Sequence, residues 1–404
     1  MRQGVRNDFP GLAGIVSLNS ASMGFASRPA LTAIARQSGL LAAGPKRDGW
    51  GGYIARYEAG VGEARREAAK LLAAAVDEVG LVGDTTAGLH HAVDALPLRD
   101  GDNIVLSDLE YPQVALAADN AKRERRIEVR FVPNRAGTVA IDDYVAAIDR
   151  RTRAVLVSSV GWVTGQRMDL AAFSELATKR GFFLVVDAVQ QLGAISIDCS
   201  KLAIDFLTAG GYKWLNSPFG CGVFYARRSV HRRGLRVRRV GLQGMREPRM
   251  GWDLFYGSPK MVARPRLFPA QSGRRFEAQG TPNRLGAAGL AAALAHRNAQ
   301  GRRVVDRHIH DLVAELIAGL DERGAKIWTP RKEADRAGIV SFTFGGGPAT
   351  ELRLQKALEK QKIYTGVRYC AGVGGVRVSP HLFNTRDDIR HFFSAIDAIR
   401  RRGR

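Results

Sequence analysis

The chain alternates short apolar segments with longer amphipathic ones, and this alternation constrains its fold more than any other feature. Segments rich in Val, Ile and Phe have the length of buried strands, and they lie at 103–109, 128–133, 153–160 and 181–189. Apolar residues recur every three to four positions, as in a helix buried on one face, at 62–75 and 169–181. This alternation predicts an α/β fold with a mostly parallel sheet, which binds ligands at the carboxyl ends of its strands.

The pattern changes after residue 284, which predicts a second, smaller α+β domain. Long helices are expected first, then two strands and a last helix, at 284–299, 303–324, 337–346, 374–380 and 386–401. A chain of 404 residues also exceeds what a single core usually holds. We expect a large domain at 20–284 and a small domain made of 1–19 and 285–404.

The formal net charge of +22 raises nucleic-acid binding as an alternative function. Basic residues cluster at 122–126, 226–239 and 400–404. No helix-turn-helix, zinc-finger or RNA-recognition pattern accompanies these clusters, and they lie in otherwise amphipathic segments. The pattern therefore favours a solvated arginine-rich surface, with nucleic-acid binding kept as a remote alternative.

Neither a membrane anchor nor a metal site is predicted. The sequence has no apolar run of about 18–20 residues, and its first residues lack the apolar core of a secretory signal, so we expect a cytoplasmic protein. Cys199, Cys221 and Cys370 are widely spaced, without a CxxC pair or a nearby histidine at metal-ligand spacing. Structural disulfides and a zinc site are not expected.

The chemically distinctive residues follow predicted strands. Asp187 ends an apolar strand, and Lys213 lies between two aromatic residues about 25 positions later. A buried acid seeks a cation, and a pyridinium nitrogen is one such cation. Pyridoxal 5'-phosphate (PLP) requires a lysine, a carboxylate for its ring nitrogen and backbone amides for its phosphate. The segment Asp84-Thr85-Thr86, at a predicted helix N-terminus, supplies such amides.

Seven stretches together resemble the class V aminotransferase superfamily of fold type I PLP enzymes, in its cysteine desulfurase, selenocysteine lyase and isopenicillin N epimerase branch. They are LNSASMG (18–24), GDTTAGLHHAV (83–93), GDNIVLSDLEYP (101–112), VDAVQQLG (186–193), AGGYKWLNSPFGCGVFY (209–225), RRFEAQGTPN (274–283) and GGVRVSPHLFNTRDDI (374–389). The resemblance implies a mostly parallel seven-stranded sheet in the large domain and a smaller α+β domain at the C-terminal end.

The resemblance also assigns roles around the cofactor. Lys213 becomes the Schiff-base lysine, Asp187 the partner of the ring nitrogen, and Gln190 the donor to the ring 3'-oxygen. Thr86 and the amide of Ala87 would hold the phosphate, and Tyr111 would stack on the ring. Thr281 in the GTPN motif would reach the phosphate of a neighbouring subunit, which implies a homodimer with shared active sites.

Two arginines are candidates for substrate binding. Arg377 matches the arginine that binds the substrate α-carboxylate, which suits a planar two-pronged donor. Arg368 either binds a distal carboxylate or sulfonate of the substrate or pairs with an acid of the small domain. Ser159 and Trp162 lie where the family contacts the 3'-oxygen side of the cofactor. The segments 20–24 and 47–53 are either parts of the substrate entrance or plain loops.

The chain departs from the desulfurase pattern at three positions. Gly210 stands where desulfurases have Ser or Thr, and Tyr212 stands where they have His, so Tyr212 is the candidate that replaces the imidazole. Cys370 lies only seven residues before Arg377, too close for the long mobile loop that carries a persulfide-forming cysteine. This argues against a sulfur-delivering desulfurase. Because FEAQGTPN and RVSPHLFNT resemble the lyase and epimerase branch more than the true aminotransferases, we expect β-elimination at the C–S bond of a cysteine-derived amino acid, with epimerisation or transamination as alternatives.

Overall fold

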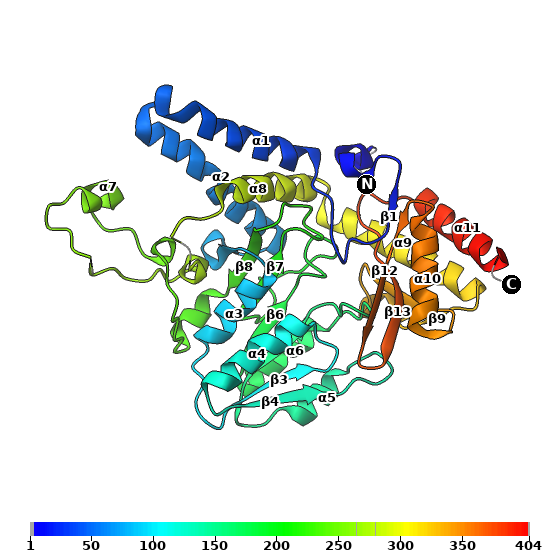
Figure 1. Ribbon diagram of the computed structural model, residues 1–404. Coiled ribbons are helices and arrows are strands. Elements are labelled where there is room, and N and C mark those ends of the chain that lie inside the picture. The colour runs from blue at the N-terminus through cyan, green and yellow to red at the C-terminus, as the bar shows by residue number, and fades with distance from the viewer. Residues whose placement is uncertain (1–3, 264, 279, 403–404) are drawn as a thin grey trace.

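The computed structural model describes residues 4–263, 265–278 and 280–402, and its larger part is built on a seven-stranded sheet (Figure 1). The strand order is β2-β8-β7-β6-β5-β3-β4. Pairing is parallel from β7 to β4, and β8 is antiparallel to both of its neighbours. The strands are β2 (Val79–Val82), β3 (Asn103–Ser107), β4 (Glu128–Val132), β5 (Thr152–Ser158), β6 (Phe183–Asp187), β7 (Phe206–Gly210) and β8 (Gly222–Ala226). The predicted mostly parallel sheet is confirmed.

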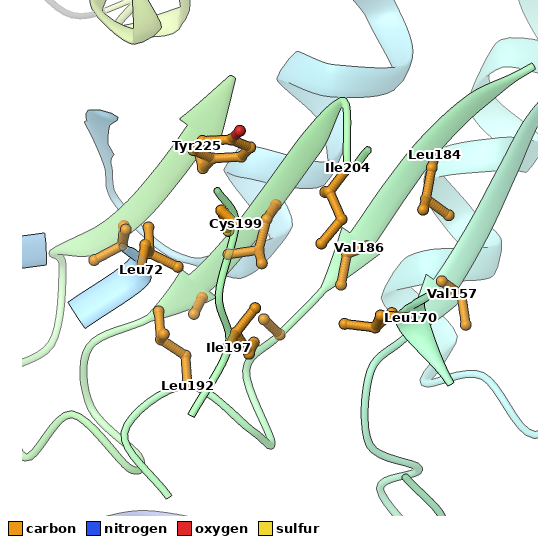
Figure 2. Close-up of a cluster of buried hydrophobic side chains, with 14 of the residues drawn as sticks. Leu72, Val157, Leu170, Leu184, Val186, Leu192, Ile197, Cys199, Ile204 and Tyr225 are labelled. Atoms are coloured by element: carbon orange, nitrogen blue, oxygen red, sulfur yellow. The ribbon is translucent and has the colours of Figure 1, made fainter. Parts of the chain in front are cut away.

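Helices bury both faces of this sheet, which explains why its strands are apolar at successive positions. On β3, Ile104 packs into one buried cluster with Leu89 and Val114, whereas Val105 packs into the cluster on the other face. Figure 2 shows part of that second cluster, in which Leu72 lies beside residues of the sheet. The covering helices are α2 (Gly49–Leu72), α3 (Thr85–Ala95), α4 (Pro112–Glu124), α5 (Ile141–Ala147) and α6 (Leu170–Arg180).

Helix α2 begins 13 residues before the predicted start at 62, so the interpretation of 47–53 as a loop was wrong from Gly49 onward. Its first turns contain glycines, which disfavour helix. Tertiary packing compensates, because α2 lies along α8 (Arg284–Ala299) and α1 (Arg28–Ala43) (Figure 1). A Cβ at Gly60 would lie 3.1 Å from the Cβ of Ala288, so the small residues permit this close approach.

The smaller part contains a four-stranded antiparallel sheet in the order β12-β13-β10-β9. Its elements are β9 (Lys326–Ile327), β10 (Val340–Thr343), β12 (Gly366–Cys370), β13 (Val373–Val378), α9 (Arg302–Glu322), α10 (Gly347–Glu359) and α11 (Arg386–Arg402). Val5, Phe9 and Leu12 join the apolar cluster of this part. Strand β1 (Val16–Ser17) also pairs with β11 (Ile363–Tyr364). The exact domain boundaries stay a prediction.

The sheet brings the predicted site residues to one edge. Strands β3, β5, β6 and β7 are parallel, so their carboxyl ends lie together. Asp187 is the last residue of β6, and Tyr111, Ser159 and Lys213 follow the ends of β3, β5 and β7 within four residues. Helix α3 begins soon after β2, whose carboxyl end lies at the same edge because both β2 and β7 are antiparallel to β8.

Two kinds of structure are absent from the described residues. No described helix has both the length and the apolar character needed to cross a bilayer. Across 4–263, 265–278 and 280–402, no three His, Cys, Asp or Glu side chains are grouped so that they could hold a metal ion.

Candidate active site

A cavity of about 440 Å³ opens at the carboxyl edge of the large sheet, which is a suitable volume for a small organic ligand. Its lining combines a helix N-terminus, aromatic rings, an acid and a lysine. The lining residues are Gly83, Asp84, Thr85, Thr86, Leu89, Tyr111, Gln113, Asp187, Val189, Tyr212, Lys213, Phe219 and Gly220. Of the predicted cofactor and catalytic residues, Thr86, Tyr111, Asp187, Tyr212 and Lys213 are thus brought together.

Asp187 is a buried carboxylate at the floor of this cavity. Its Oδ1 accepts the Val189 N–H at 2.9 Å, and no ion pair to it occurs within the described part of the chain. Burial raises the pKa of Asp187 to about 6, although the Val189 amide and Lys213 oppose this effect. A cation placed against the carboxylate would restore its ionised form.

Ser159 does not line the cavity but holds the backbone of Asp187 by hydrogen bonds. Its backbone N–H and its hydroxyl both donate to the Asp187 carbonyl, at 2.9 and 3.3 Å. The side chain is fully buried. Ser159 therefore fixes the end of β6, and its predicted contact with a cofactor stays a prediction.

Lys213 is nearly buried and has aromatic neighbours on both sides. Its Nζ lies 5.8 Å from the ring centre of Tyr111 and 5.7 Å from that of Tyr212. Burial lowers the pKa of Lys213 to about 8; Asp187 opposes this effect, and Arg377 and Arg368 add to it. An amine with a lowered pKa is a better nucleophile and base near neutral pH.

Gly24 fixes the backbone that carries Lys213. Its N–H donates to the Tyr212 carbonyl at 2.8 Å, and a Cβ on Gly24 would lie 2.0 Å from the Lys213 carbonyl oxygen. Only glycine permits this approach. The segment 20–24 therefore packs against the backbone of Lys213, but neither it nor the helical segment 47–53 lines the cavity, so their predicted place at the substrate entrance stays a prediction.

The first turn of α3 forms the predicted phosphate cup. Thr85 Oγ1 accepts the Gly210 N–H at 2.8 Å, which joins the helix to the end of β7. Thr86 lines the cavity. The Ala87 N–H, predicted to hold phosphate, instead donates to the Asp84 carboxylate at 2.7 Å. Asp84 therefore occupies an amide that a bound anion could use.

Tyr111 is in contact with Trp162 beside the cavity. Their rings meet edge to face, with centres 5.2 Å apart. Tyr111 lies at the N-cap of α4 and lines the cavity, as its predicted stacking role requires. The Trp162 carbonyl accepts a hydrogen bond from Arg377 at 2.7 Å, but Trp162 does not line the cavity, and its predicted contact with a cofactor stays a prediction.

Arg368 and Arg377 lie on one face of the β12–β13 hairpin. Arg377 pairs with Gly366, and Arg368 pairs with Gly375, which makes the two arginines diagonal neighbours. Their Nη2 atoms donate to the same Ser22 hydroxyl, at 3.3 Å from Arg368 and 2.7 Å from Arg377.

Neither guanidinium has an acidic partner among residues 4–263, 265–278 and 280–402. The expected alternative, in which Arg368 pairs with an acid of the small domain, therefore has no support in these residues. Burial lowers the pKa of Arg377, and the nearby Arg368 adds to this effect. Two guanidiniums without an acidic partner in the described part of the chain, one of them fully buried, are suited to bind an anion.

Gln190 does not line the cavity. Its carbonyl accepts the Trp214 indole N–H at 2.9 Å, and its amide donates to the Ala21 carbonyl at 3.1 Å. One amide hydrogen remains for another acceptor. Its predicted bond to the cofactor 3'-oxygen stays a prediction.

Thr281 is exposed and does not line the cavity of its own chain. Two residues later, Asn283 donates to the carbonyl of Gly220, which does line it, at 3.0 Å. The motif therefore lies at the rim. Its predicted reach into a neighbouring subunit stays a prediction, and Gln279 in the same motif lies outside the described residues.

Cys370 closes a two-residue hairpin turn, where it pairs with Val373. Its thiol donates to the Asp108 carbonyl at 3.4 Å, and burial with Asp108 and Glu110 raises the pKa of the thiol. A protonated thiol on a tight turn is a poor nucleophile. Cys221 is buried, as expected from its packing role.

Sequence reasoning missed three residues of the site. Phe219 stacks on Tyr212 with ring centres 5.0 Å apart, and Gln113 lines the cavity. Glu110 accepts the Ser158 N–H at 2.9 Å and the Ser158 hydroxyl, and burial raises its pKa to about 7. In the sequence, Phe219 is only an aromatic residue after a proline, and Glu110 is only an acid next to Tyr111. Neither residue belongs to a motif whose spacing indicates an active site.

Comparisons with known proteins agree with this geometry. The model of the aminotransferase class-V family matches residues 20–392. A probable cysteine desulfurase of Methanothermobacter thermautotrophicus is 27% identical, with 98% of this chain and 97% of that protein covered. The isopenicillin N epimerase of Streptomyces clavuligerus is 26% identical, with 95% of each chain covered.

Solved structures share the fold of the whole chain. The cystine C–S lyase C-DES, in complex with its reaction product cysteine persulfide, is 25% identical with a TM-score of 0.83, and the match covers 96% of this chain and 98% of that one. The predicted fold type I architecture is confirmed. The chain belongs to the aminotransferase class-V family.

Proposed function

We propose that this protein is a PLP-dependent lyase that cleaves the C–S bond of a cysteine-derived amino acid. The observation that carries the proposal is one cavity that holds Lys213 with a lowered pKa and Asp187 with a raised pKa. Two arginines lie close to it, and neither has an acidic partner among the described residues. The overall reaction converts R–S–CH₂–CH(NH₃⁺)–COO⁻ and water into pyruvate, ammonium and R–SH.

The residues of the cavity fit PLP. Asp187 is a buried carboxylate without a cation among the described residues, which suits a protonated ring nitrogen. Lys213 has an amine free of ion pairs in the same part of the chain, and Thr86 lies at a helix N-terminus that suits a phosphate. When bound, PLP supplies an electron sink for the carbon next to the substrate carboxylate.

The protein side chains then divide the work of proton transfer. Arg377 holds the substrate α-carboxylate. Lys213 Nζ removes the proton from the substrate α-carbon, because its lowered pKa leaves part of the amine neutral near pH 7. Burial raises the pKa of Tyr212, so its hydroxyl stays protonated and donates to the departing sulfur.

Arg368 extends this assignment to a second anionic group of the substrate. It shares Ser22 with Arg377 and has no acidic partner among the described residues. A substrate with a carboxylate beyond its sulfur, as in cystine, would use both guanidiniums. The similarity to a cystine C–S lyase supports this substrate class.

Epimerisation is the second candidate, because the chain is similar along nearly its full length to an isopenicillin N epimerase. It requires a proton donor on the face of the substrate opposite Lys213. Transamination instead requires return of the proton to the cofactor, and it remains the third candidate.

We also propose a homodimer. Large apolar side chains stay exposed around α1, α2 and the 250–268 segment, and a second subunit would cover them. They include Leu31, Leu41, Trp50, Ile54, Met250, Leu254, Tyr256, Val262 and Phe268.

Mixing Lys213→Ala and Thr281→Ala subunits tests whether Thr281 acts on a neighbouring site. Shared sites predict that the mixture regains activity, because one site of each hybrid is intact. Inactive mixtures with proven subunit exchange would contradict this arrangement.

The experiment for the reaction is an amino-acid panel with product analysis by mass spectrometry. The lyase proposal predicts pyruvate and a thiol or persulfide from cystine and cysteine conjugates, without an added amino acceptor. Keto acid formed only with an acceptor would establish transamination. Exchange of the α-proton for deuterium with inversion and without ammonia would establish epimerisation.

A further inference from the structure

Asp84 places a negative charge in the cup that the proposed cofactor phosphate would occupy. It is the N-cap of α3, and its Oδ1 accepts the Ala87 N–H at 2.7 Å. Asp84 lines the same cavity as Thr86 and Lys213. It has no cationic partner within 4–263, 265–278 and 280–402. The carboxylate is therefore held only by the helix N-terminus.

From this geometry, and resting on the proposed PLP dependence, we propose that Asp84 competes with the cofactor phosphate for the N-terminus of α3. The helix offers few further donors, because only its first-turn amides lack acceptors within the helix. Thr85 Oγ1 is already committed as an acceptor to Gly210. To bind, a phosphate must take the Ala87 N–H from Asp84 or lie beside an uncompensated carboxylate.

Like charges close together near a protein surface repel each other. The repulsion acts on the phosphate and not on the pyridine ring or aldehyde. Asp84 therefore lowers affinity for phosphorylated ligands selectively, and salt weakens this effect. In the cofactor-free protein, the same carboxylate keeps the first turn of α3 capped and the cup formed.

The test compares PLP with pyridoxal, which lacks the phosphate, in titrations followed by absorbance. Asp84→Asn keeps a side chain that caps helices and removes the charge. We expect it to bind PLP about tenfold more tightly, a change of roughly 1.4 kcal/mol, with pyridoxal affinity changed less than twofold. Inorganic phosphate should likewise compete with PLP more strongly in the variant. Asp84→Gly provides a second variant without a cap, and circular dichroism confirms that each is folded.

Asp169→Asn is the matched control. Asp169 caps α6 through the Ala171 and Ala172 amides and lies outside this cavity. It should leave both affinities unchanged. An unchanged or reduced ratio of PLP to pyridoxal affinity in folded Asp84→Asn would overturn the inference while leaving PLP dependence intact. Failure of the wild-type protein to bind PLP would instead overturn the proposed function.

Discussion

Arg368 and Arg377 donate to one hydroxyl, Ser22 Oγ, from adjacent strands of a single hairpin, at 3.3 and 2.7 Å. Two guanidiniums seldom lie this close without an acid between them, because their charges repel. Gly366, which pairs with Arg377, lies beside this pair, and a Cβ there would be in ordinary contact with Arg377 Nε at 3.7 Å. A substrate with two carboxylates would offer one to each guanidinium.

Replacement of Arg368 should distinguish substrates by charge. Arg368→Ala should raise KM for cystine about tenfold or more, and it should change KM for a conjugate without a second anionic group less than threefold. Arg377→Lys is the comparison, because loss of the two-pronged contact should impair both substrates. Steady-state kinetics check this. Equal effects of Arg368→Ala on both substrates would remove its distal-anion role.

The hydroxyl of Tyr212 should matter most for poor leaving groups. Tyr212→Phe keeps the ring that stacks on Phe219 and removes the proposed proton donor. We expect kcat to fall about 10–100-fold for a thioether substrate, whose alkyl thiolate needs a proton. The loss should be smaller for cystine, which releases a less basic persulfide. A uniform loss for both would indicate that Tyr212 does not protonate the sulfur.

The lowered pKa of Lys213 predicts how the stability of the cofactor-free protein depends on pH. The folded-state pKa of about 8 lies below the ordinary lysine pKa of 10.5, so between these values the unfolded chain binds more protons. The free energy of unfolding therefore gains nothing from Lys213 below pH 8, and it rises as the pH increases from 8 to 10.5. The rise is about 3 kcal/mol at most.

Urea unfolding of cofactor-free protein at pH 7.5 and pH 10 measures this contribution. The control is Lys213→Met, in which the other titrating groups are unchanged, so the difference between the two proteins isolates Lys213. The wild-type protein should gain stability relative to Lys213→Met as pH rises. A parallel pH dependence in the two proteins would show that Lys213 is not desolvated.

Gly24 should tolerate no side chain. Gly24→Ala places a Cβ at 2.0 Å from the Lys213 carbonyl oxygen, so the backbone must move at a cost of about 1–3 kcal/mol or more. Gly39→Ala is the control, since nothing lies within 4 Å of its Cβ in the middle of α1, and it should stabilise by about 0.5–1 kcal/mol. Thermal melts compare them. A harmless Gly24→Ala would contradict the close contact.

Cys370 should be dispensable. Its thiol has a raised pKa and sits on a two-residue turn, so it is unsuited to attack sulfur. Cys370→Ser should keep kcat/KM for cystine within about threefold. Mass spectrometry of the wild-type protein after turnover should show no persulfide on Cys370. A hundredfold loss of activity together with such an adduct would make the protein a desulfurase.

The strands and the reacting residues were predictable because each leaves a local signal. The central strands are buried on both faces, so their apolar runs are unbroken, and Asp187 and Lys213 are polar residues that directly follow such runs. The start of α2 was not predictable, because packing against α8 overrides a glycine-rich sequence.

The contacts within the site could not be predicted, because they join residues that are far apart in the sequence. Ser22 meets two arginines about 350 residues away, and Ser159 turns its hydroxyl to a carbonyl rather than to the cavity. The Asp84 cap was visible as an N-cap signal. The competition between Asp84 and a phosphate could be inferred only from the structure, in which Asp84 lines the same cavity as Lys213.

The most direct test of the account is the absorbance of the purified protein titrated with PLP, compared with Lys213→Ala. We expect a visible absorbance band from a Schiff base in the wild-type protein. Borohydride should reduce this Schiff base to a stable adduct, and mass spectra of the peptides should place the adduct on Lys213. The Lys213→Ala protein should lack both the band and the adduct. A wild-type protein without the band, or an unchanged band in folded Lys213→Ala, would contradict the central claim.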